Sequence, residues 1–116
     1  MQDTEIGKSK KHILIELIDY SSNSVTSKII IGKTTGSVSI LAFDSKKILP
    51  ETVSAFDVFI QIIEGDAEII IDKHTNPLKT GEGIIVPAHT SYFIKANKKF
   101  KMISTVIKSG YEENTL

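Results

Sequence analysis

The sequence predicts an all-β domain, and three observations support this prediction. The apolar runs are short, and turn residues separate them about every 8 to 12 positions, as in small β-sandwiches and barrels. Isoleucine occurs twenty times, in runs such as 29–31 and 69–71, and β-branched side chains favour strands. No segment carries an apolar stripe with helical spacing over about a dozen residues, so no long amphipathic helix is expected.

The first apolar run, residues 11–18, fits either a strand or one to two helical turns. After it, strands alternate with turns made of glycine and polar residues. Residues 44–47 and 72–77 are interpreted as turns, and Pro50 as a break in the next segment. The expected strands span residues 25–31, 37–43, 55–63, 67–71, 84–86, 91–95 and 100–107. With the first run this makes eight or so elements, which suits a small sandwich or a closed barrel.

A chain of 116 residues is expected to form one domain with a core that needs no disulfide or metal. The domain is expected over residues 11–108, between flexible tails at 1–10 and 109–116. Lys98, Lys99 and Lys101 are interpreted as solvated charges on a strand edge, where they discourage aggregation. No stretch is long and apolar enough for a signal peptide or a membrane span, so a cytoplasmic location is expected.

The composition argues against several classes of function. Without cysteine the chain has no disulfides, cysteine-ligated zinc, iron–sulfur clusters or thiol catalysis. Fourteen lysines balance fourteen acidic residues, and this zero net charge argues against a nucleic-acid partner and against binding to a membrane surface. Because every basic residue is a lysine, no guanidinium group is present to clamp a phosphate or carboxylate through two hydrogen bonds.

Three segments carry a family resemblance: residues 59–69, 78–88 and 100–102. Their order is a strand, a Glu-Gly turn, a strand, a Gly-Glu turn and a strand that ends at Pro-Ala. This pattern resembles the cupin superfamily, in particular the small single-domain cupins, and Gly65, Gly81 and Pro87 have the spacing of the two cupin motifs. The resemblance implies a double-stranded β-helix, or jelly-roll barrel, with a pocket at its open end. It also implies a homodimer.

The same resemblance indicates where cupins carry their metal ligands. The two histidines of the first motif correspond to Thr52 and Ser54, and its glutamate corresponds to Val58. The histidine of the second motif corresponds to Tyr92. Hydroxyl groups are weak ligands for divalent transition metals and valine offers no donor atom, so neither a metal nor another cofactor is expected here.

The three histidines of the chain are His12, His74 and His89. His12 is interpreted as a surface or strand-edge residue and His74 as a solvated turn residue. His89 lies three positions before Tyr92, at the rim of the implied pocket. Its imidazole either faces the pocket as a base or lone ligand, together with Glu51, or bonds to backbone or water, and the second interpretation is favoured. His89, Tyr92 and Glu51 are the candidate catalytic residues.

In a jelly-roll barrel the side chains at the former ligand positions point inward. The cavity they line suits a small neutral or aromatic ligand, whose orientation the hydroxyl groups would fix. The alternative is that these side chains fill the barrel, as they do in other small barrels. The residues expected to line the pocket are Thr52, Ser54, Val58, Ile60 and Tyr92, with Ile62 and Phe56 beside them.

Three hypotheses for the function follow. The first is a metal-free module that binds or senses a small molecule in the barrel pocket. The second is an enzyme of cupin type, an isomerase or dioxygenase, with a non-standard site built on His89 and Tyr92. The third is a structural or regulatory homodimer that associates through edge strands and residues 11–18. Whether the chain is an enzyme stays open at this point.

Overall fold

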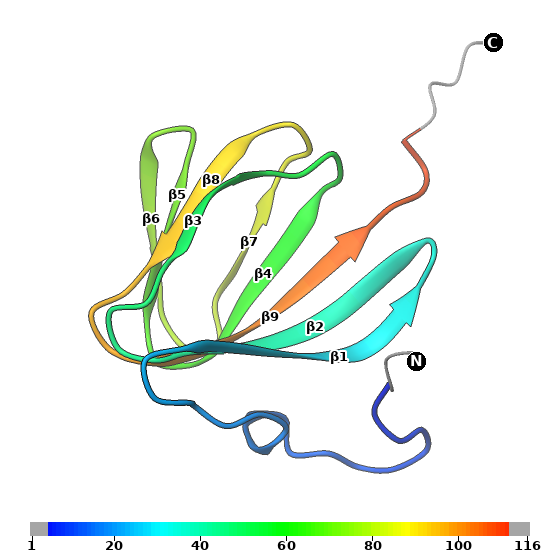
Figure 1. Ribbon diagram of the computed structural model, residues 1–116. Helices are drawn as coiled ribbons and strands as arrows, with labels where there is room; N and C mark the ends of the chain where they lie inside the picture. The colour runs from blue at the N-terminus through cyan, green and yellow to red at the C-terminus, as the bar shows by residue number, and fades with distance from the viewer. Residues whose placement is uncertain (1–4, 112–116) are drawn as a thin grey trace, which may run out of the picture.

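Two β-sheets face each other across an apolar core (Figure 1). The structure is a computed structural model, and it describes residues 5–111. These residues form a 3₁₀-helix, η1 (Leu14–Glu16), and nine strands. The strands are β1 (Val25–Lys33), β2 (Gly36–Phe43), β3 (Leu49–Val53), β4 (Val58–Glu64), β5 (Ala67–Ile71), β6 (His74–Leu78), β7 (Gly83–Val86), β8 (Ser91–Lys95) and β9 (Phe100–Ile107).

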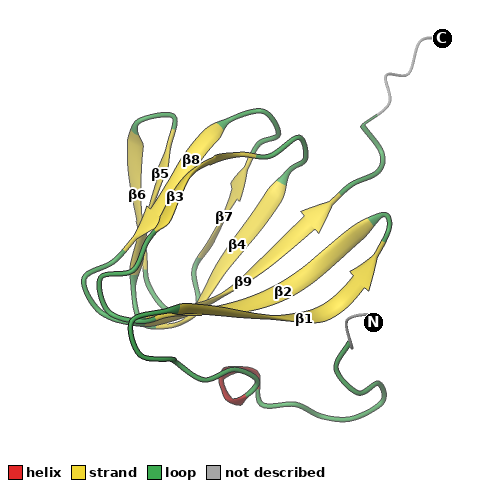
Figure 2. Ribbon diagram, in the orientation of Figure 1, coloured by secondary structure: helices red, strands yellow, loops and turns green. Residues whose placement is uncertain are grey.

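The strand order is that of a jelly roll. One sheet has the order β1-β2-β9-β4-β7 and the other has the order β3-β8-β5-β6, with antiparallel pairing throughout. Strands joined by short loops make up most of the described chain, as Figure 2 shows. The predicted all-β fold, a double-stranded β-helix, is therefore confirmed. No helix among residues 5–111 is long and apolar enough to cross a membrane.

The core lies between the inner faces of the two sheets. Along β4 the buried residues Val58, Ile60 and Ile62 alternate with more exposed ones, as expected for a strand that is covered on one face. The rings of Phe43 and Phe100, which are partners across β2 and β9, stack with their centroids 4.5 Å apart. This alternation places the side chains of Val58, Ile60 and Ile62 in the interior.

The sequence-based assignment misses β3 and β6, and both omissions involve proline. Pro50 and Pro77 lie within these strands, which form the two edges of the four-stranded sheet. Proline is tolerated on an edge because its missing N–H can face away from the neighbouring strand. The interpretation of residues 72–77 as a turn is wrong beyond Lys73. Two residues with positive φ, Asp72 and Lys73, make the whole hairpin turn.

The two glycine turns and the proline stop agree with the prediction. Gly65 and Gly81 adopt φ values of +84° and +92°, which L-amino acids with a side chain rarely adopt. Pro87 follows β7 directly and ends it. The cupin-like spacing of these three residues thus reflects real turns and a real strand end.

The N-terminal arm, residues 5–20, runs along the outer face of the five-stranded sheet (Figure 1). Ile18 packs there against Ile40 and Ile103, so the ambiguous apolar run forms η1 and a covering segment instead of a strand. The arm also reaches β1, where the Glu5 carboxylate accepts a hydrogen bond from the Gly32 amide at 2.8 Å. Glu5 therefore does not belong to a free tail. Residues 1–4 and 112–116 of the predicted tails lie outside the described residues.

Lys101 holds the arm in place. Only 6% of this residue is exposed, so interpreting it as a solvated edge charge is wrong. Its ammonium group donates to the Ile15 carbonyl and lies 4.0 Å from a Glu64 carboxylate oxygen and 4.9 Å from the centre of the Tyr20 ring. The Tyr20 hydroxyl donates to Glu64 at 2.9 Å. Burial raises the pKa of Tyr20, and the nearby Glu64 carboxylate raises it further.

Replacing Lys101 with methionine is expected to loosen the arm while leaving the core strands intact. The substitution keeps the buried length but leaves the Ile15 carbonyl without its charged donor, a loss of about 1–3 kcal/mol. Hydrogen exchange at the η1 amides of Glu16 and Leu17, which bond to Ile13 and Leu14, should accelerate by tenfold or more. Lys99→Met is the matched control, because exposed Lys99 also lies over Tyr20. Equal exchange in the two variants would contradict this role of Lys101.

Candidate functional site

The predicted site lies at the end of the sandwich where the β3–β4 and β7–β8 loops meet, which we call the mouth. The His89 amide donates to the Ser54 carbonyl at 2.6 Å, and the Ala88 amide donates to the Asp57 carboxylate at 2.8 Å. His89 adopts a φ of +63°, a conformation uncommon for a residue with a side chain. The hydrogen bond to Ser54 therefore fixes the main chain of His89, while its imidazole is exposed at the rim.

Tyr92 is the polar side chain that enters the interior at the mouth. It pairs with Thr52 across β3 and β8 and is only 7% exposed. Its ring belongs to the same apolar cluster as Val58 and Ile60, so the structure brings these three predicted residues together. Burial raises the pKa of the Tyr92 hydroxyl, because the charged phenolate is less well solvated in the apolar interior.

The Tyr92 hydroxyl differs from the other hydroxyl groups at the mouth. Thr52 donates to the Pro50 carbonyl at 2.8 Å, and the Ser54 oxygen accepts from the Phe56 amide at 3.0 Å. Among residues 5–111, no hydrogen bond to the Tyr92 hydroxyl is found, and no fully buried side-chain oxygen lacks a partner. The phenol oxygen thus retains access to solvent. It can accept a hydrogen bond from a ligand or donate one to it.

Glu51 does not lie beside Tyr92, the buried one of the catalytic candidates. Its carboxylate accepts a hydrogen bond from the Ser91 hydroxyl. Ser91 pairs with exposed Val53 on the outer face of the four-stranded sheet, whereas the neighbouring Tyr92 points inward. The side chains of Glu51 and Tyr92 are therefore on opposite faces of this sheet, and no acid–base pair forms between them.

The residues at the mouth do not fit a divalent metal ion. Val58 has no donor atom, and a neutral tyrosine hydroxyl such as that of Tyr92 is a poor ligand, which burial makes still harder to deprotonate. The hydroxyl groups of Thr52 and Ser54 are already bonded to nearby main-chain groups. Within the described part of the chain, no three histidine, aspartate or glutamate side chains converge in a way that could hold a metal.

Tyr111 and Asp57 also contribute to the mouth, and neither was among the sequence-based candidates. The Tyr111 hydroxyl donates to the Ile107 carbonyl at 2.5 Å and accepts from the Asp57 amide at 2.8 Å. The Tyr111 ring lies 5.8 Å from the Phe56 ring, centre to centre. The segment after β9 therefore borders the mouth, although its sequence carries no periodic signal that predicts this.

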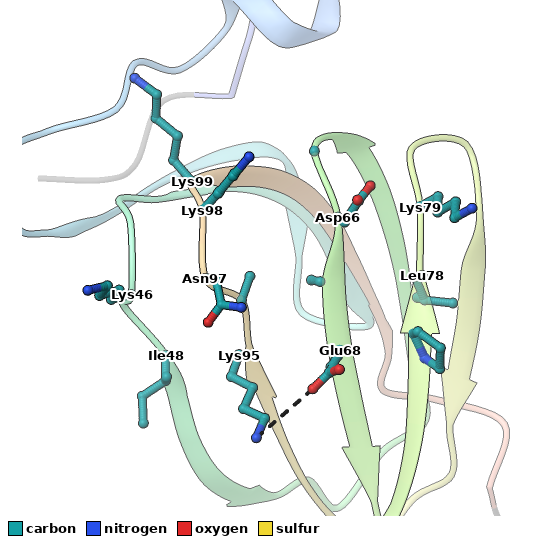
Figure 3. Close-up of a pocket in the computed structure, with 14 residues that line it drawn as sticks. Lys46, Ile48, Asp66, Glu68, Leu78, Lys79, Lys95, Asn97, Lys98 and Lys99 are labelled. Carbon is teal, nitrogen blue, oxygen red and sulfur yellow. Dashed lines mark ion pairs between the residues drawn. The ribbon is translucent and has the colours of Figure 1, made fainter.

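A surface depression of about 740 Å³ lies at the opposite end of the sandwich (Figure 3). It is open to solvent, and none of the residues predicted to line the pocket contributes to it. The turn between β4 and β5, the ends of β6 and β8 and the loops that flank them form its walls. It is lined by Lys46, Ile48, Gly65, Asp66, Ala67, Glu68, Pro77, Leu78, Lys79, Lys95, Ala96, Asn97, Lys98 and Lys99.

Comparison with solved structures identifies the class of protein as a single-domain β-sandwich of jelly-roll type. A conserved protein of unknown function from Streptococcus pyogenes superposes with a TM-score of 0.86 at 22% identity, covering 95% of this chain and 97% of that one. A cupin superfamily protein from Desulfitobacterium hafniense gives 0.85 at 22% identity, covering 94% and 100%. The chain therefore has the fold of the small cupins.

More distant structures with the same fold include named proteins. KdgF from a Halomonas species superposes with a TM-score of 0.71 at 15% identity, over 82% of this chain and 92% of that one. No protein-family model matches the chain, and no curated protein sequence matches it. At such low identities these likenesses establish the fold, and the function has to be argued from the site.

Proposed function

We propose that this chain is a binding module that holds a small neutral or aromatic molecule at the mouth, without a metal ion. The observation that supports the proposal is Tyr92, whose ring packs in the apolar cluster while its hydroxyl reaches solvent and has no hydrogen-bond partner among the described residues. A flat ligand that carries one hydrogen-bond acceptor would bond to this phenol and lie against the apolar side chains at the mouth. A charged ligand would lose its hydration there without gaining a counter-ion.

The metal-free part of the proposal rests on the chemistry of the donor groups at the mouth. Protein purified without chelator from metal-supplemented cells is expected to contain far less than one equivalent of iron, manganese, nickel, copper or zinc. Mass-spectrometric elemental analysis measures this directly. A near-stoichiometric metal content would contradict the proposal, and it would favour the enzyme hypothesis with His89 as the first residue to replace.

Replacing Tyr92 with phenylalanine is expected to weaken binding at the mouth while leaving the fold intact. Benzamide is a suitable probe, because it combines a flat ring with a neutral acceptor. The loss of one hydrogen bond corresponds to about 1 kcal/mol, or roughly a fivefold rise in Kd. Titration followed by NMR should show benzamide shifting the amides of Ser54, His89 and Tyr92 in the unmodified protein.

Tyr20→Phe is the matched control for this experiment. Tyr20 lies on the arm side of the five-stranded sheet, where its hydroxyl bonds to Glu64, so its replacement should leave the benzamide Kd unchanged. Two results would count against the proposed function. One is benzamide binding that does not shift the amides at the mouth, and the other is an equal Kd for the protein with and without the Tyr92 hydroxyl.

The predicted homodimer remains a proposal about assembly. The apolar side chains of Ile13, Leu14 and Ile15 are exposed on the arm, and Phe59 and Ile85 are exposed as partners on the outer face of β4 and β7. Exposed apolar groups of this kind favour association with a second copy of the chain.

A further inference from the structure

The depression opposite the mouth collects much of the positive charge of the chain. Five of the fourteen lysines line it, together with two carboxylates, Asp66 and Glu68. Its lining therefore carries a formal charge of +3, although the whole chain has a net charge of zero. The lysines come from the β2–β3 loop, the residue after β6, the end of β8 and the β8–β9 loop. These segments are separated along the chain, so the fold brings the lysines together.

Most of these ammonium groups lack a partner of opposite charge in the described structure. Lys95 is paired with Glu68, at 4.0 Å, as the dashed line in Figure 3 shows. Lys99 extends toward the arm, where its nitrogen lies 4.8 Å from the centre of the Tyr20 ring. Among residues 5–111, no carboxylate lies within 4.0 Å of the remaining three, Lys46, Lys79 and Lys98. Like charges that share a concave surface repel one another, and a bound anion relieves that repulsion.

The floor of the depression is apolar. Ala67 and Leu78 are buried partners across β5 and β6, and Ala96 packs against the core beside them. Figure 3 shows Asn97 between Lys46 and Asp66, where its amide is accessible to a ligand. The depression thus combines an apolar floor with cationic groups on several sides. Its volume of about 740 Å³ falls within the range of small-molecule sites.

We propose that this depression binds a small organic anion that carries at least two carboxylates on an apolar body. Lysine ammonium groups act as mobile point charges, so they accept carboxylates in many orientations without the fixed geometry of arginine. The apolar body would cover Ala67 and Leu78, while the carboxylates would approach Lys46 on one side and Lys79 or Lys98 on the other. This site is separate from the proposed site at the mouth. It binds an anionic ligand, whereas the mouth binds a neutral one.

An NMR titration at constant ionic strength tests the proposal, with isophthalate as the dianionic probe. Benzoate and benzamide serve as its singly charged and neutral analogues. Isophthalate is expected to shift the amides of Gly65, Asp66, Asn97 and Lys98, and to bind at least tenfold more tightly than benzoate. Benzamide should leave these amides unchanged, whether or not it binds at the mouth. Isophthalate shifts confined to the mouth, or none at all, would overturn the proposal.

A charge-reversal pair distinguishes a site from general attraction of anions. The double substitution Lys46→Glu with Lys98→Glu should weaken isophthalate binding at least tenfold. The control double substitution, Lys28→Glu with Lys108→Glu, changes the net charge by the same amount at exposed positions on β1 and after β9. The control should bind isophthalate within about twofold of the unmodified protein. Equal weakening in both double variants would mean that the lysines act only through the net charge, and would overturn the proposed site.

Discussion

Replacing Phe100 with alanine is expected to lower the free energy of unfolding by about 3–5 kcal/mol, as typical for a buried phenylalanine. Phe100 is fully buried, and its ring stacks on Phe43 at an interplanar angle of 8°. The two rings join the middle strands of the five-stranded sheet to the core. The cavity left by the substitution cannot collapse easily, because rigid β-strands surround it. Urea unfolding followed by circular dichroism measures the loss.

Phe59→Ala provides the control for this prediction. Phe59 is a neighbour of β9 as well, but it lies on the outer face of β4 and is 39% exposed. Its removal is expected to cost less than half as much as the removal of Phe100, since a partly exposed ring loses less burial. If both substitutions cost the same, the inner faces of the sheets would not be the main core.

Strand positions could be predicted well wherever one face of a strand is covered. The predicted strands at 67–71, 91–95 and 100–107 have the bounds of β5, β8 and β9. The edge strands β3 and β6 were missed, because whether a proline is tolerated depends on which side of a strand is paired. That pairing is a property of the sheet topology, which local sequence does not contain. The burial of Lys101 was missed for the same reason, since a distant segment covers it.

The site could be predicted only in part. The motif spacing led to Val58 and Tyr92, which belong to one buried apolar cluster. The side-chain directions of Thr52 and Glu51 could not be derived, because a register shift between Leu49 and Thr52 interrupts the alternation along β3. The lysine-lined depression was not predicted either. Its residues come from segments that are separated along the chain, so only the folded arrangement reveals it.

Alanine substitutions at Gly65 and Gly81 are expected to separate two contributions to the loss of stability. One is the strain of a positive φ, and the other is the crowding of the new Cβ. Both glycines have positive φ, so alanine costs about 1–2 kcal/mol in each case. A Cβ at Gly81 would meet no atom within 4 Å, whereas one at Gly65 would lie 2.9 Å from the Lys99 carbonyl oxygen and 3.2 Å from the Phe100 Cα. Crowding against backbone adds about 1–3 kcal/mol, so Gly65→Ala should be the more destabilising change. Urea unfolding of the two variants measures the difference.

The Gly65 substitution also connects the fold to the depression. To relieve the contact, the Lys99 carbonyl has to move, and with it the β8–β9 loop that carries Lys98. Isophthalate binding should therefore weaken in Gly65→Ala, while Gly81→Ala, whose position does not line the depression, should keep the unmodified affinity. Benzamide binding at the mouth should be equal in both variants. If Gly65→Ala is as stable as Gly81→Ala, the close contact between Gly65 and the Lys99 carbonyl does not determine the conformation of the β8–β9 loop. In that case the depression owes its shape to other contacts, of which the pairing of β4 with β9 is the nearest.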